Sequence, residues 1–424
     1  MGIKAVNRFA QKVFYGASLL LAFTIPLAKH AIPTILCFLC VSWFFDDSLP
    51  QKWKNIKKNK SILVFISLYL LYLIGLFYSD NMRYGIDDVF LKVPMLLMPL
   101  LYLSLEKEKE SKFFQHILIA FISGSFIGTL ISYTHSAVLF TSSHDIFDFY
   151  YATLAWFMHP SYFAMHLNFC IIALLWMLVT KNTIIIKYRW IAVFLIFYFS
   201  VFIVFLNSKL GLLFLGLIYL YSIYFFIRQK KYILSASLLM GVVISVVFIV
   251  HNFAGITNRI VSAGETVKNF KNLDKASGDG TVERIMIWKV SAKIISDNLI
   301  AGVGTGDVKD VLLENYQKYG IKGAYEKKLN AHNQFLQTFI ALGLPGIFLL
   351  VFMFAYPFYF SWKRRNLLYA FFLLLMVINL LVESMFETQA GVIFYTFFNA
   401  ILFSEFSKKN FRPIDNNTES LNLT

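Results

Sequence analysis

The chain has 424 residues, of which 58% are hydrophobic and 18% aromatic, and its mean hydropathy is +0.64. Charged residues make up only 15% of the chain, against roughly 25% in a soluble globular domain. This composition excludes a soluble protein and indicates a polytopic membrane protein. The net charge of +15 does not indicate nucleic-acid binding, because lysine and arginine recur in short clusters between apolar runs, as in membrane proteins of defined topology.

Apolar runs of about 20 residues predict twelve membrane-spanning helices. The predicted spans are residues 13–29, 31–46, 61–79, 89–105, 114–134, 160–180, 189–207, 210–227, 232–252, 334–358, 366–382 and 390–406. The first follows a basic segment, MGIKAVNRFAQK, with no convincing small-residue cleavage site, so we expect it to be retained.

The basic clusters orient these spans. Alternate loops carry clusters such as QKWKNIKKNK, RQKK and WKRR, whereas the loops between them hold few basic residues. The positive-inside rule therefore predicts that both termini are cytoplasmic. The chain then divides into nine spans within residues 1–252, an outer loop at 253–331, three more spans within 332–406 and a polar cytoplasmic tail at 407–424.

The long outer loop has its own helical pattern. TVERIMIWKVSAKIISD, residues 281–297, and DVKDVLLENYQKYG, residues 307–320, carry apolar residues at helical spacing. We expect them to form a small helical cap on an all-α membrane bundle. The intervening GVGTGD, residues 302–307, lacks a preceding strand and the GxGxxG spacing, so it predicts a tight turn with Asp307 near the next helix start.

A histidine stands where the long loop meets the tenth span, in NAHNQFLQTFIALGLPG at residues 330–346. Asn330 is a plausible N-cap, which would place His332 in the first helical turn. The positive end of the helix dipole there favours a neutral imidazole, the form that a general base needs. The alternative is a histidine that only anchors the helix at the lipid headgroups.

Cations gather on the same predicted face. Arg284 and Trp288 are four residues apart, so they share a helix face on which the indole could orient the guanidinium for phosphate binding. Lys209 stands beside Asn207 and Ser208 in a tight turn whose helix start offers further donors to an anion. The alternatives are an arginine and a tryptophan at the membrane surface, and a lysine that extends to headgroups.

Two further groups lie on this face. Glu383 and Glu387 could bind a sugar or a cation, but we expect them to form salt bridges with the basic groups, and Lys92 is expected within reach. HPSYFAMH, residues 159–166, opens the sixth span and is interpreted as an aromatic anchor. Each residue alone is ambiguous, but together they place a histidine and several cations on one membrane face, which indicates a site.

These motifs resemble one known family. SKLGLL at a tight outer turn, then ERIMIW, GVGTGD and NAHNQFLQTFIALGLPG, occur in an order similar to that of the O-antigen ligase and O-antigen polymerase superfamily of bacterial envelope enzymes. The resemblance is strongest over about residues 205–350, and its most specific element runs from His332 to Gly343.

The resemblance implies glycan transfer from an undecaprenyl pyrophosphate donor, without metal or nucleotide cofactor, at the periplasmic face of the inner membrane. The outer loop would then be periplasmic. His332 would activate the acceptor hydroxyl, and Arg284 would bind the pyrophosphate. Ser208 and Lys209 stand where the family commonly has serine-arginine, so the charge is kept but the bidentate fork is lost. Asn333 and Trp288 are expected beside the substrate.

The leading hypothesis is an O-antigen ligase that joins a polysaccharide to lipid A-core. Its rivals are an O-antigen polymerase, a protein O-oligosaccharyltransferase and a transporter of lipid-linked sugars. A transporter would be expected to have ionisable residues near the bilayer midplane and two related halves. Here most spans are apolar in the middle, and the sequence has no recognisable internal repeat. Because no carboxylate nucleophile is evident beside His332, we expect transfer with inversion.

Overall fold

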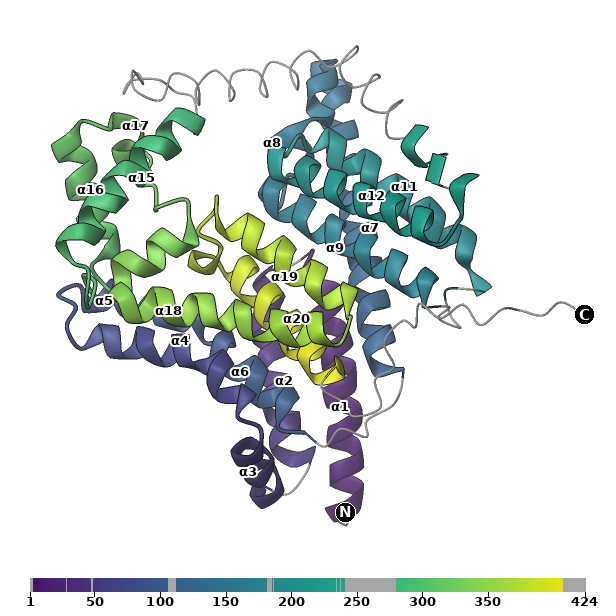
Figure 1. Ribbon diagram of the computed structural model, residues 1–424, viewed down its shortest axis with the longest axis horizontal. Coiled ribbons are helices and arrows are strands. Elements are labelled where there is room, and N and C mark those ends of the chain that lie inside the picture. Colours follow the sequence, from purple (N-terminus) through teal and green to yellow (C-terminus); the bar gives the residue numbers. More distant parts are fainter. Residues whose placement is uncertain are drawn as a thin grey trace, which may run out of the picture.

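The computed structural model describes residues 3–27, 29–46, 49–105, 112–180, 185, 187–233, 235–236, 238–240 and 280–406. Within these residues every regular element is an α-helix or a short 3-10 helix (Figure 1). The predicted all-α class is therefore confirmed. The expected tail at 407–424 and the first part of the long outer loop lie outside the described residues.

The elements follow the order of the predicted spans. They are α1 (Ile3–Thr24), η1 (Lys29–Ala31), α2 (Ile32–Asp46), α3 (Leu49–Lys58), α4 (Ser61–Leu76), α5 (Met82–Lys92), α6 (Pro94–Leu103), α7 (Phe113–Ser143), η2 (Ile146–Phe149), α8 (Tyr151–Leu154), α9 (Pro160–Val179), α11 (Arg189–Phe205), α12 (Lys209–Arg228), α15 (Gly280–Asp297), α16 (Val308–Tyr319), α17 (Lys322–Glu326), α18 (Gln334–Lys363), α19 (Leu367–Leu380), η3 (Met385–Glu387) and α20 (Gln389–Phe406). Helices occupy every predicted span except the ninth, which lies largely outside the described residues.

Two predicted boundaries are wrong. The fourth span, predicted at 89–105, is divided between α5 and α6 because Pro94 starts a new helix at its first position. The fifth continues beyond residue 134 as α7 to Ser143. Four helices among the described residues are long and apolar enough to cross a membrane: α7, α9, α12 and α18. The count of twelve crossings therefore stays a prediction.

The core of the molecule surrounds α20 and α9. Every residue of α20 from Gly391 to Phe403 is buried, and α9 is buried over most of its length. Rings from four helices meet there. Phe121 of α7, Phe169 of α9, and Phe394 and Phe398 of α20 have centroids 4.7 to 5.7 Å apart, and Phe372 of α19 joins them. Tilted and edge-on packing of this kind favours one fixed arrangement of the four helices.

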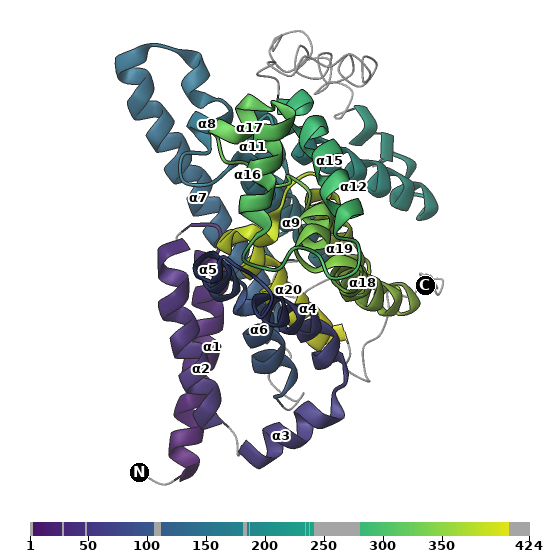
Figure 2. The same ribbon diagram turned by 90° about the vertical axis from the view of Figure 1, so that its left-hand side faces the viewer.

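The helices α15, α16 and α17 form the described part of the predicted cap. They contact one another, and α15 and α16 also pack against α18, on the far side of the molecule from the N-terminus (Figure 2). Their positions agree with the two amphipathic segments predicted at 281–297 and 307–320.

The glycine-rich turn between α15 and α16 locks this cap to the bundle. Gly343 has a φ of +60° and breaks α18. The break leaves the carbonyl groups of Ile340 and Ala341 free of hydrogen bonds within the helix. The backbone N–H groups of Val303 and Gly304 donate to these carbonyls at 2.8 and 3.0 Å. GVGTGD is thus a tight turn, as the sequence predicted, and the structure shows in addition that it docks on α18.

Candidate functional site

A cavity of about 580 Å³ opens where several helices begin. Its walls come from the starts of α9, α12 and α15, the loop before α18 and the turn after α19. Its polar and charged lining consists of Tyr151, His159, Ser161, Asn207, Ser208, Lys209, Thr281, Glu283, Arg284, Lys327, His332 and Glu383. Four predicted site residues, Ser208, Lys209, Arg284 and His332, therefore share one cavity.

His332 lies just before α18 and not inside it. The N-cap is Asn333, whose side chain accepts from the N–H groups of Phe335 and Leu336 at 2.9 and 3.2 Å. The predicted N-cap at Asn330 is therefore wrong. Asn330 instead accepts from the backbone N–H of His332 at 3.0 Å, and His332 has a φ of +46°. This turn brings the imidazole to the cavity wall, away from the helix axis.

Glu383 joins the two residues to which the resemblance gives catalytic roles. One carboxylate oxygen, Oε1, accepts from the guanidinium of Arg284, and the other, Oε2, lies 3.2 Å from Nδ1 of His332. The Glu383 side chain is only 11% exposed. The carboxylate therefore fixes the orientation of both partners, and a proton on Nδ1 leaves Nε2 of His332 as the basic nitrogen.

The surroundings favour an ionised Glu383. Burial alone would raise the pKa of its carboxyl, but the hydrogen bond from His332 and the positive charge of Arg284 outweigh that effect. The net result is a pKa of Glu383 below its ordinary value. The site accordingly contains a carboxylate beside the imidazole of His332, a neighbour that the sequence analysis did not foresee when it found no evident carboxylate nucleophile there.

The turn that carries Lys209 is held firmly. Ser208 caps α12 by accepting from the N–H of Gly211 at 3.2 Å. The buried amide of Asn168 on α9 donates to the carbonyl of Gly211 at 3.0 Å. Lys209 reaches across the cavity, and its Nζ lies 3.3 Å from Oγ1 of Thr281 in the first turn of α15. Lys209 and Arg284 thus face the same cavity from two separate helices.

A third cation lies at the edge of the cavity. Nζ of Lys327 is 3.2 Å from both carboxylate oxygens of Glu283, which neighbours Arg284 in α15. Gly323 makes room for this pair, because a Cβ there would lie 2.3 Å from Oε1 of Glu283. The cavity therefore contains three cations and two carboxylates, with each of the two carboxylates paired to one cation.

Trp288 and Asn333 do not line this cavity. Trp288 packs partly buried against the core, and the cation–π contacts among the described residues do not include Arg284 with Trp288. The guanidinium is oriented by Glu383 instead. Asn333 uses its side-chain oxygen to cap α18. It therefore helps to fix the backbone next to His332 and does not face the cavity itself.

A second, buried ion cluster supports the turn that carries Glu383. Lys92 is fully buried, pairs with Asp88 and lies 3.2 Å from Oε1 of Glu387. Gln334 donates to the same oxygen at 3.3 Å and accepts from the N–H of Phe386 at 2.7 Å. These bonds fix residues 383–388 against the start of α18. The prediction that both glutamates pair with cations is confirmed.

Several lining residues were not predicted from the sequence. His159 was interpreted as part of an aromatic anchor, yet it lines the cavity and caps α9 by accepting from the N–H of Ser161 at Nδ1, 3.3 Å away. Glu283 and Lys327 were not assigned to the site, because no sequence pattern indicated a role for either residue. Among the described residues no group of three histidine, cysteine or acidic side chains is arranged to hold a metal ion.

One comparison with known proteins bears on this site. Residues 192–351 match a protein-family model described as O-antigen ligase, which confirms the resemblance found in the sequence. The family implies an enzyme of the O-antigen ligase or polymerase kind that acts on lipid-linked glycans in a bacterial membrane. The match includes Lys209, Arg284 and His332 and ends before Glu383. No curated protein sequence matches the chain.

Proposed function

We propose that this chain, whose residues 192–351 match the O-antigen ligase family model, transfers a glycan from undecaprenyl pyrophosphate to lipid A-core at the periplasmic face of the inner membrane. The observation that carries the proposal is the joint placement of Arg284, Glu383 and His332 on one cavity wall. A base, a cation for the leaving group and a group that orients both are what this transfer requires.

His332 acts as the general base. Its Nδ1 is turned toward Glu383 at 3.2 Å, so Nε2 takes the proton from the acceptor hydroxyl as the oxygen attacks the anomeric carbon. The new glycosidic bond forms while the bond from the anomeric carbon to the phosphate oxygen breaks. Glu383 stabilises the imidazolium that results, as a buried carboxylate does in related dyads.

Arg284 and Lys209 stabilise the leaving group. Undecaprenyl pyrophosphate departs with the electrons of the broken bond, and its negative charge needs compensation in the transition state. A guanidinium has five N–H donors, so the contact with Glu383 leaves others for a phosphate. Lys209 adds a point charge at the start of α12, where backbone N–H groups also favour an anion.

The structure supports inversion for a new reason. Glu383 is close enough to be considered as a nucleophile, but Arg284 engages one of its oxygens and His332 the other. A carboxylate held in this way is poorly placed to attack the anomeric carbon. Direct attack by the acceptor, with inversion of that carbon, therefore remains the proposed course.

The function is tested in a host that lacks this gene and is complemented with the wild type, His332→Ala or His144→Asn. His144 lies outside the cavity in the left-handed conformation that asparagine tolerates. We expect wild type and His144→Asn to restore long chains on lipid A-core. We expect His332→Ala to leave those chains on the polyprenyl carrier, as seen on gels of lipopolysaccharide and of lipid-linked glycan.

The same gels separate the rival functions. Lipopolysaccharide with a single repeat unit in the host without the gene would favour the polymerase. Unchanged lipopolysaccharide together with lost protein glycans would favour the protein O-oligosaccharyltransferase. Turnover of lipid-linked glycan by purified protein would exclude the transporter.

The proposed orientation has its own test. Glu326 is exposed on α17, in the cap that the proposed topology, with both termini in the cytoplasm, puts in the periplasm. In a variant without the native cysteines, Glu326→Cys should react with an impermeant maleimide in intact spheroplasts. Reaction only after lysis would reverse the topology.

A further inference from the structure

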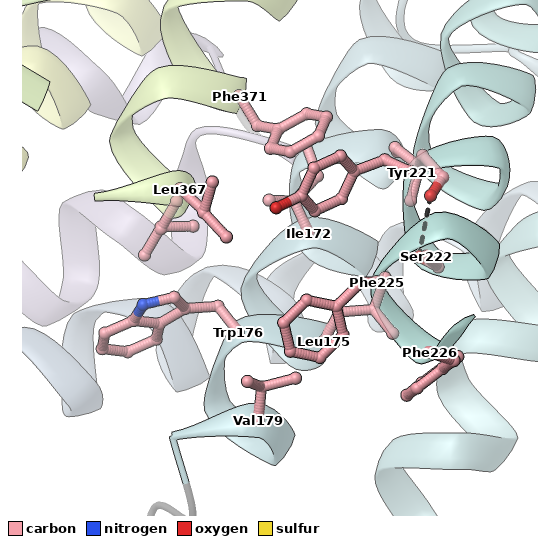
Figure 3. A pocket seen from close by; sticks show the side chains of 12 residues that line it. Ile172, Leu175, Trp176, Val179, Tyr221, Ser222, Phe225, Phe226, Leu367 and Phe371 are labelled. Carbon is pink, nitrogen blue, oxygen red and sulfur yellow. Dashed lines mark hydrogen bonds between the residues drawn. The ribbon is translucent and has the colours of Figure 1, made fainter. Parts of the chain in front are cut away.

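A pair of adjoining cavities lies at the other ends of the helices that build the site. The smaller, about 70 Å³, is enclosed mostly by apolar side chains of α9, α12 and α19, among them Trp176, Val179 and Phe226 (Figure 3). The larger, about 840 Å³, lies among the ends of α12 and α18 and the start of α19. Tyr221 and Phe371 are among the residues that line both, so the two cavities lie side by side.

The larger cavity has a cationic rim. Arg228 and Lys230 at the end of α12 and Arg365 after α18 line it and are exposed. Among the described residues of its lining there is no aspartate or glutamate. Two amphipathic aromatic side chains, Tyr224 and Trp362, stand at the same rim and are 57% and 74% exposed. Rings of this kind favour the interface between lipid headgroups and hydrocarbon.

A buried donor without an acceptor lies in the same wall. Asn366 caps α19 by accepting from the N–H of Tyr369 at 3.0 Å, and the residue is only 2% exposed. No residue in the described part of the chain accepts a hydrogen bond from its Nδ2. A buried amide group normally has a partner. The first N–H groups of the 14-residue helix α19 begin beside it, so the wall offers several donors to an anion.

We propose that this groove binds an anionic glycerophospholipid. Its phosphate lies against Arg228 and Arg365, next to Asn366 at the start of α19, and one acyl chain extends toward the apolar cavity of Figure 3. Charge complementarity selects the headgroup, because the described lining residues include three cations and no acid, so they attract a net negative charge and gain little from a zwitterion. The apolar cavity accounts for the chain, since hydrocarbon is removed from water there.

The groove is separate from the site of glycan transfer. Lys209 begins α12 at that site and Arg228 ends it at the groove. At about 1.5 Å per residue, 20 residues place the two about 30 Å apart, the thickness of a bilayer core. A polyprenyl donor whose pyrophosphate must reach His332 therefore does not have its headgroup in this groove, which favours a phospholipid of the opposite leaflet.

The test uses tryptophan quenching by lipids with a dibrominated acyl chain, because Trp176 and Trp362 line the two cavities. Full-length protein, stripped of lipid in a mild detergent, is titrated with brominated phosphatidylglycerol or with phosphatidylcholine of the same chains. Trp176→Phe and Trp362→Phe identify the signal of these two residues among the seven tryptophans. We expect phosphatidylglycerol to quench this signal at about a tenfold lower mole fraction than phosphatidylcholine.

Charge variants decide the proposal. The double variant Arg228→Gln with Arg365→Gln should abolish the preference for phosphatidylglycerol, whereas Lys363→Gln should keep it, because Lys363 is exposed nearby but does not line the groove. Equal quenching by both lipids in the wild type, or a preference that survives in the double variant, would overturn the proposal. Undecaprenyl phosphate that displaces the brominated lipid better than unlabelled phosphatidylglycerol does would instead assign the groove to a polyprenyl lipid.

Discussion

Oε2 of Glu383 lies 3.2 Å from Nδ1 of His332, although 51 positions separate the two residues in the chain. The other oxygen of the same carboxylate pairs with Arg284, which is 99 positions away. One side chain therefore connects the loop before α18, the helix α15 and the turn after α19.

Glu383→Gln should lower glycan transfer by about 10- to 100-fold, because the neutral amide can still accept from Nδ1 of His332 but no longer stabilises the imidazolium with a negative charge. His332→Ala should lower transfer further, by about 10²- to 10⁴-fold, since it removes the base itself. Transfer is measured with purified protein and a lipid-linked glycan. Glu326→Gln is the matched control, because Glu326 is exposed and does not line the cavity. Full activity of Glu383→Gln would remove Glu383 from the mechanism.

The stability that Glu383 contributes should depend on pH. Folding lowers the pKa of its carboxyl below the ordinary 4.5, so the unfolded chain binds the proton more readily than the folded protein does. The contribution is then complete at neutral pH and is lost as the pH falls from about 4.5 through the lower folded value. Melting temperatures of wild type and Glu383→Gln should differ at pH 7 and converge at acid pH. A constant difference would contradict an ionised Glu383.

Exchanging arginine for lysine at position 284 and lysine for arginine at position 209 should affect glycan transfer differently. Arg284→Lys cannot reproduce the contact with Glu383 while it also binds phosphate through a planar fork, so transfer should fall by about 10- to 100-fold. Lys209→Arg should retain most activity, because its Nζ lies 3.3 Å from Oγ1 of Thr281 and a guanidinium can also make this contact. Lys293→Ala is the control, since Lys293 lies on the exposed face of α15 in a surface pair. Equal losses for both exchanges would show that charge alone matters.

Gly343→Ala should destabilise the protein by about 1–3 kcal/mol. Gly343 has a φ of +60°, and a Cβ there would lie 2.3 Å from the carbonyl oxygen of Ile300. Gly216→Ala in α12 is the matched control, because a Cβ at that position meets nothing within 4 Å. Thermal unfolding in detergent should show a lower melting temperature for Gly343→Ala alone. Similar melting temperatures for both variants would mean that the kink in α18 is not tied to the glycine-rich turn.

Most of the helices and part of the site could be predicted from the sequence alone. The length of an apolar run and the spacing of apolar residues are local properties, so the amphipathic helices at 281–297 and 307–320 could be predicted, as could most of the apolar ones. The motif order that identified the family is local too, and it contributed Lys209, Arg284 and His332. The split at Pro94 and the true N-cap at Asn333 were missed, because neighbouring residues offered equally good starts.

Which polar side chains lie in contact could be seen only in the folded structure. Glu383 had the same signal as Glu387 in the sequence, yet Glu383 lies on the cavity wall and Glu387 pairs with the buried Lys92. His159 entered the site because α9 and α12 pack together through Asn168 and Gly211. Such pairings depend on the burial of charges and on how close two backbone segments can approach. Both arise from contacts between segments that are distant in the chain, so no single stretch of sequence reveals them.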